Sequence, residues 1–89
     1  MVQLGGDFHC ITFLVDGQGA VSFHLDVHAD PLGSTRQGTI TCPGPVRIVA
    51  EERRDGAGVY LGSVQGNVFH WEAQCPRFTG VHYTIHLAY

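Results

Sequence analysis

This 89-residue sequence has few charged residues. Asp, Glu, Lys and Arg make up only 15% of the residues, well below the quarter that is usual in globular domains. There is no lysine, so all five basic side chains are arginine, and the formal net charge is −3. A protein that holds nucleic-acid phosphates needs a clustered basic face. We therefore expect no nucleic-acid partner, and a surface with few charges to keep copies of the chain apart.

Long apolar runs are also missing. Nowhere do 18 uncharged apolar residues follow one another, which is about the shortest length expected of a membrane-spanning helix. The segment after Met1, VQLGGDFHC, has neither the basic region nor the apolar stretch of a signal peptide. The expectation is a cytoplasmic protein with no membrane partner.

Cysteine pairs with metal or redox spacing are absent. Cys10, Cys42 and Cys75 form an odd set without a CxxC pair, which favours free thiols in a reducing compartment over a disulfide framework. Cys42 and Cys75 each precede a proline, and the alternative is that these two lie close together. No phosphate loop, dinucleotide fingerprint, nucleophile elbow or EF-hand loop occurs, so no cofactor is expected.

Helical periodicity is lacking as well, and what the sequence contains instead is alternation of apolar and polar side chains. This period of two is typical of half-buried strands. The predicted fold is all-β, with residues 1–89 forming one domain. We expect a small antiparallel meander of about six or seven strands, closed as a barrel or as a two-sheet sandwich. The segments that predict strands are 8–15, 20–29, 38–42, 46–53, 59–64, 67–74 and 81–88.

Short turn sequences predict how these strands pair. Asp55-Gly56 is the strongest two-residue hairpin signal in the chain, and it would set 46–53 beside 59–64. Gln65-Gly66 would likewise join 59–64 to 67–74. Pro31 and Gly33 predict a loop over residues 30–37.

The six histidines include two HxxxH pairs, His24 with His28 and His82 with His86. On a strand, residues four apart are separated by about 13 Å, too far to share one ion. Neither pair can chelate a metal alone. Residues two apart on a strand are separated by roughly 6.6 Å and can converge, as His24 with Asp26, Asp26 with His28, and His70 with Glu72 could.

The register between the last two predicted strands decides whether a histidine cluster forms across them. If Gln74 faces His82, Trp71 and Tyr83 lie on one apolar face, and the alternation favours this register. The opposite face then gathers five polar side chains, which are His70, Glu72, His82, Thr84 and His86.

Three interpretations of this predicted face stay open. It could hold a metal through His70, Glu72, His82 and His86, or support catalysis with Glu72 as the base and His70 and His86 as ligands or proton donors. It could be the solvated side of an antiparallel sheet, where such residues are ordinary occupants. It could also line a polar cavity inside a barrel.

The aromatic residues allow two interpretations. Tyr60, Trp71 and Tyr83, together with Thr84, could form a surface on which a small ligand stacks. Rings at alternating strand positions are also typical of a core.

Two functions from different classes follow. The first is a non-enzymatic binding module that takes a small-molecule ligand, or copies of itself, through an apolar sheet face. A chain of this length buries only roughly 60 to 65% of its unfolded surface, so a homo-oligomer is the expected assembly. The alternative is a small enzyme or metal-binding protein that uses His70, Glu72, His82 and His86.

Overall fold

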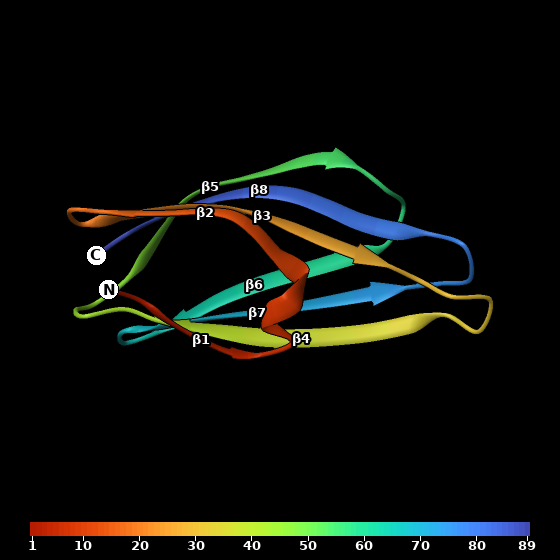
Figure 1. Cartoon of the computed structure of the whole chain (residues 1–89), viewed down its shortest axis with the longest axis horizontal. Helices are drawn as coiled ribbons and strands as arrows, with labels where there is room; N and C mark the ends of the chain where they lie inside the picture. Colours follow the sequence, from red (N-terminus) through yellow and green to blue (C-terminus); the bar gives the residue numbers. More distant parts are fainter.

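The computed structural model describes all residues 1–89 and consists of eight β-strands and one short 3₁₀-helix (Figure 1). The prediction of an all-β fold is confirmed, and of the two closures considered the two-sheet sandwich is observed. The structure contains no helix of the length and apolarity needed to cross a bilayer. The elements are β1 (Gln3–Gly6), η1 (Phe8–Cys10), β2 (Ile11–Gly17), β3 (Ala20–His28), β4 (Ser34–Thr41), β5 (Arg47–Asp55), β6 (Val59–Gln65), β7 (Val68–Cys75) and β8 (Gly80–Ala88).

The strands form two antiparallel sheets of four. Sheet A has the order β1-β4-β7-β6 and sheet B the order β2-β3-β8-β5. Figure 1 shows them as two layers, with the strands of sheet B in the upper part of the view and those of sheet A in the lower part. The edge strands are therefore β1 and β6 in sheet A, and β2 and β5 in sheet B.

The core lies between the two sheets and follows the alternation read from the sequence. On β3, buried Val21, Phe23, Leu25 and Val27 alternate with partly exposed polar residues. The same pattern on β7 buries Phe69, Trp71, Ala73 and Cys75. No polar or charged residue is fully buried. The accessible surface of 5050 Å² matches the ~5,100 Å² expected for a compact monomer of this mass.

Trp71 has the position that most constrains sheet A. Its cross-strand partners are Gly38 on β4 and Gly62 on β6. A Cβ atom on Gly38 would lie 2.7 Å from the Trp71 ring and 2.8 Å from the carbonyl oxygen of Gly5. The fully buried indole thus fits because β4 presents a glycine to it.

The order of the strands differs from that of a simple meander. Only β2–β3 and β6–β7 are hairpins, and the other connections pass from one sheet to the other. The hairpin predicted at Asp55-Gly56 is wrong, because β5 pairs with β8 and β6 pairs with β7. The connection crosses between the sheets instead, and the Gly58 N–H donates to the Gly80 carbonyl at 2.9 Å.

Strand boundaries were predicted well except near the N-terminus and before β4. β1 was not predicted, residues 8–10 form a 3₁₀-turn rather than the start of a strand, and β4 begins at Ser34 inside the predicted loop. In the β6–β7 hairpin, Gln65 lies opposite Val68 around a Gly66-Asn67 turn. That shifts the predicted register by two residues, which leaves every side chain on its predicted face.

Candidate functional site

The predicted histidine and glutamate cluster does not form. His70 and Glu72 lie on β7 in sheet A, whereas His82, Thr84 and His86 lie on β8 in sheet B. Both groups alternate with buried residues and so face outward from opposite sides of the sandwich. The prediction failed because the connection through Pro76 carries the chain across to the other sheet instead of closing a hairpin.

The chemistry assigned to that cluster loses its geometric basis. The metal and catalytic roles considered for His70, Glu72, His82 and His86 required these side chains to share one face. The structure contains no group of three or more His, Cys, Asp or Glu side chains arranged to hold a metal ion. All three cysteines are free and buried, and burial is the main cause that raises the pKa of each thiol.

A different polar network lies on the outer face of sheet B, centred on Asp26 of β3. Its carboxylate accepts hydrogen bonds from Thr12 at 3.0 Å and from Arg54 at 2.7 Å, and it lies 2.8 Å from His82 Nδ1. Partial burial raises the pKa of Asp26, but the bonds from His82, Arg54 and Thr12 outweigh it and lower the pKa overall. Asp26 therefore stays ionised and ties β3 to β2, β8 and β5.

A serine and a histidine meet on the same face. Ser22 Oγ lies 2.8 Å from His86 Nδ1, and His86 Nε2 lies 3.9 Å from the Glu52 carboxylate. Nucleophilic catalysis also needs a substrate pocket and donors for an oxyanion. None of the surface hollows is lined by Ser22, Glu52 or His86, so this arrangement is a contact between strands. Sequence reasoning missed it because it depends on β3 lying beside β8.

The predicted aromatic surface is also divided. Trp71 is fully buried, as the core interpretation required, and Thr84 faces outward from sheet B. Tyr60 and Tyr83 face each other across the gap between the sheets, with ring centroids 4.3 Å apart. These four residues therefore do not form a common surface for a ligand.

Beyond the connection at residues 56–58, the gap between β5 and β6 is closed by side chains. Tyr60 on β6 donates a hydrogen bond from its hydroxyl to the Glu51 carboxylate on β5. Arg53 on β5 lies over the Tyr83 ring at 5.0 Å and donates to the Gly58 carbonyl at 3.0 Å. We call this the open side of the sandwich, because beyond that connection no backbone segment covers the gap between β5 and β6.

The edge of β6 on the open side has unpaired backbone groups. Gln65 and Val68 flank a two-residue turn, so they form a hydrogen-bonded pair, and alternate residues of β6 repeat this pattern. The N–H and C=O groups of Tyr60, Gly62 and Val64 consequently point away from β7. No backbone group of a turn or loop reaches them. We call these six groups the β6 edge.

The other three edges are protected against pairing with another strand. β1 has only four residues. β2 is interrupted by a bulge between Thr12 and Val15, within which Phe13 has a φ of 52°. β5 has two irregularities and carries five consecutive charged residues at 51–55. Short length, bulges and charge are the devices by which proteins prevent pairing at sheet edges.

β6 has none of these devices. Its seven residues, VYLGSVQ, contain no charge and no proline, and its pairing with β7 is regular throughout. On its outer face Val59 and Leu61 are 51% and 58% exposed. The strand combines an unpaired backbone with exposed apolar side chains.

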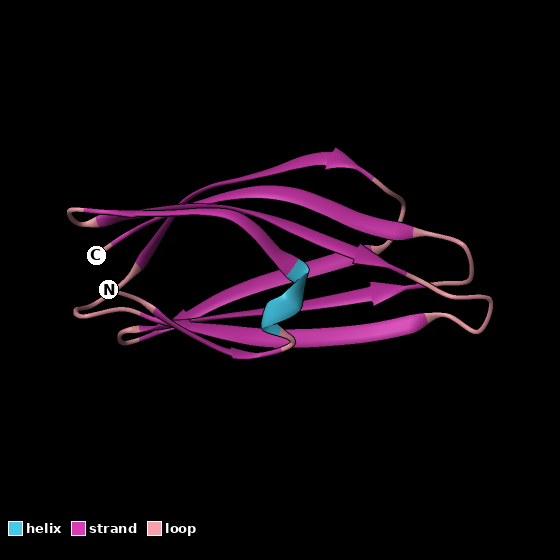
Figure 2. Cartoon of the chain, viewed as in Figure 1, coloured by secondary structure: helices cyan, strands magenta, loops and turns pink.

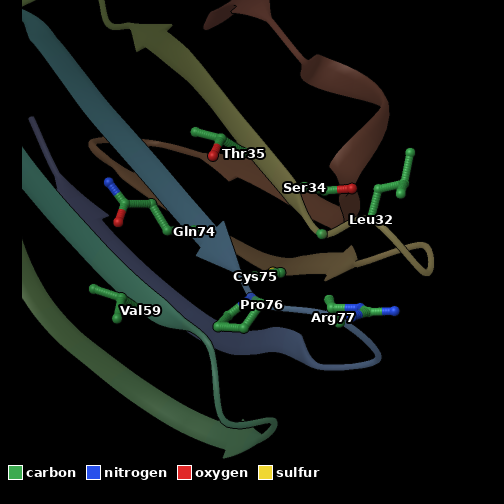
Figure 3. Close-up of a pocket in the computed structure, with 9 residues that line it drawn as sticks. Leu32, Ser34, Thr35, Val59, Gln74, Cys75, Pro76 and Arg77 are labelled. Carbon is green, nitrogen blue, oxygen red and sulfur yellow. The ribbon is translucent and has the colours of Figure 1, made fainter.

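Small-molecule pockets are poorly developed. A hollow of about 490 Å³ lies at the start of β6, where Val59, Gln74 and Thr35 from three neighbouring strands meet the loop residues Leu32 and Arg77 (Figure 3). Only three of its nine lining residues are hydrophobic, whereas ligand pockets are usually concave and mainly apolar. The β6 edge is therefore the better candidate site. Comparison of the chain with models of protein families, with curated proteins and with solved structures found no match.

Proposed function

We propose that this chain is a non-enzymatic binding module whose β6 edge takes up an extended strand of a partner protein. The observation that carries the proposal is the unpaired backbone of Tyr60, Gly62 and Val64 on a regular strand without charge or proline. Strand addition to an exposed sheet edge is a recurring mode of peptide recognition. Main-chain hydrogen bonds give such a complex its affinity, and the side chains on either face give it selectivity.

The side chains around the β6 edge favour an apolar partner strand. On the outer face, the exposed Val59 and Leu61 would contact alternate side chains of the added strand. On the inner face, Tyr60 is held in place by its bond to Glu51 and its stacking on Tyr83. A strand with apolar side chains on its outer face would bury Val59 and Leu61. Because β6 carries no charge, such a strand would need no charged side chain of its own.

The other functions have less support. A small-molecule ligand would have only open hollows to occupy, and an enzyme would need the groups that the two sheets keep apart. The free, buried thiols favour a reducing compartment such as the cytoplasm. We therefore propose the cytoplasm as its compartment and a protein strand as its partner.

A short synthetic peptide tests the proposal. The probe alternates valine and threonine over seven residues with a lysine at each end, and the control has the same sequence with alternate backbone nitrogens methylated. We expect the probe to slow amide hydrogen exchange at Tyr60, Gly62 and Val64, while the control leaves it unchanged. Protection of β2 or β5 amides instead, or no protection at all, would contradict the proposal.

A further inference from the structure

Resting on the proposed function, we infer that the strand taken up is β6 of a second copy of this chain. The two β6 strands run antiparallel about a two-fold axis at Gly62. The two four-stranded A sheets then form one continuous eight-stranded sheet. The occupant is identified by the symmetry of the β6 edge and by the charges around it.

The first argument is the register. The outward-pointing backbone groups belong to Tyr60, Gly62 and Val64, which are placed symmetrically about Gly62. Antiparallel pairing about that residue sets Tyr60 opposite Val64 of the second copy, and Gly62 opposite its own counterpart. Every outward N–H then meets an outward C=O, and all seven residues of β6 have a partner. A shift by two in either direction leaves two residues of each strand unpaired.

The second argument is the side chains that this register brings together. On the outer face Leu61 lies opposite Ser63 of the second copy, and the two Leu61 side chains are diagonal neighbours within reach of each other. Val59 lies opposite Gln65. The exposed apolar side chains of both copies therefore meet over a single stretch of the joined sheet. C₂ pairing requires such a self-complementary patch.

The third argument is charge. A two-fold axis places identical residues close together, so a charged strand would repel its own copy. β6 carries no charge, and the chain as a whole has few. The ionisable groups nearest to Gly62 on the inner face are Glu51 and Tyr60. The Glu51 carboxylate accepts the Tyr60 hydroxyl, and its proximity to the axis limits the affinity of the dimer.

The test is the sedimentation of the full-length chain from about 1 µM to about 500 µM, a range that would reveal a concentration-dependent dimer. We expect the mass to double across this range. The double variant Leu61→Lys with Ser63→Lys places like charges opposite each other and should weaken dimerisation at least about tenfold. A matched control, Thr35→Lys with Gln37→Lys, adds the same two charges on exposed positions of the interior strand β4, and should dimerise as the unmodified chain does.

A third variant tests the register. In the pairing about Gly62, position 61 faces position 63 of the second copy, so Leu61→Lys with Ser63→Glu creates two attractive cross-copy pairs. We expect this variant to dimerise within about threefold of the unmodified chain. In the registers shifted by two, position 61 faces itself or position 63 faces itself, and the same variant would be repelled. Thermal unfolding of each variant establishes that it is folded.

Each outcome has a distinct meaning. A chain that stays monomeric at the highest concentration yet binds the valine–threonine probe overturns the second copy as occupant and leaves strand addition standing. A monomer that does not bind the probe overturns both. If two lysines at positions 61 and 63 leave the dimer unaffected, its interface lies on another surface and the inference is overturned. Loss of the dimer in the lysine–glutamate variant overturns the register.

Discussion

The two long sides of the sandwich are closed by different means. On the side of β1 and β2 the chain itself crosses the gap, because η1 links the two strands and passes between the layers (Figure 2). Asp7 fixes the start of this crossing through hydrogen bonds in both directions with the backbone of Gln37. On the open side the chain crosses only at one end, through the β5–β6 connection at residues 56–58, and along the rest of these strands the side chains of Glu51, Arg53, Tyr60 and Tyr83 bridge the layers.

The edge strands on the two sides differ as well. On the side that the chain crosses, β1 is short and β2 is interrupted by a bulge, and both features discourage an added strand. On the open side, the pairing of β6 with β7 is regular throughout. We therefore expect a partner strand to pair with β6.

The largest expected difference in stability between the two sides concerns the two glycines opposite Trp71, Gly38 and Gly62. In Gly38→Ala, the new methyl group meets the buried indole and the backbone of Gly5, neither of which can move, and we expect a loss of about 3 kcal/mol. In Gly62→Ala, the methyl group meets the ends of two flexible side chains, Tyr60 and Glu51. We expect a loss of about 1 kcal/mol there.

Urea denaturation of both variants at a concentration where the chain is monomeric measures this difference. Equal losses would mean that the open side is as rigid as the side that the chain crosses. The indole nitrogen of Trp71 has no hydrogen-bond partner, so Trp71 is held by packing alone. A methyl group at Gly38 therefore tests the packing around Trp71, whereas one at Gly62 tests the side chains of the open side.

Much of the fold could be predicted because alternation is a local signal. The buried faces of β3, β7 and β8 follow directly from the order of apolar and polar residues. Strand order could not be predicted, because a turn sequence such as Asp55-Gly56 fits a hairpin and a crossing equally well. A signal was nonetheless present, since all four prolines lie in connections between sheets. Both hairpin turns, at Gln18-Gly19 and Gly66-Asn67, lack proline.

The candidate site was harder to predict than the fold. The absence of charge and proline in β6 is visible in the sequence, but its significance depends on β6 being an edge strand, which is a property of the whole topology. The histidine cluster failed for the same reason. His82 lies beside Asp26, which is 56 positions away in the chain, and not beside the preceding strand.

A smaller loss of stability is expected when the hydrogen bond between Tyr60 and Glu51 on the open side is removed. Tyr60→Phe removes the hydroxyl that bonds Glu51, and we expect a loss of about 1 kcal/mol. Burial, and then the bond and charge of Glu51, raise the pKa of Tyr60. Its contribution is fully present below the unfolded value of 10.0 and is lost as pH rises through the higher folded value. Tyr83→Phe, which keeps the stacked ring, is the control, and an equal loss in it would contradict a specific role for the Tyr60 hydroxyl.

The smallest expected effect on stability concerns Asp26, which is linked to both edge strands of sheet B, β2 through Thr12 and β5 through Arg54. Arg54→Ala removes its link to β5 on the open side and should cost about 0.5 kcal/mol, whereas Thr12→Ala removes its link to β2 and should cost less, because β2 is also held by the chain crossing.

Since the folded pKa of Asp26 is lowered, its contribution is present above the unfolded value of 3.8 and disappears as pH falls through the folded value. Denaturation curves measured in this acid range should therefore converge for the unmodified chain and Asp26→Asn. If Thr12→Ala proved the more costly change, the side that the chain crosses would depend on side-chain contacts more than the open side does, and the contrast between the two sides would have to be reversed.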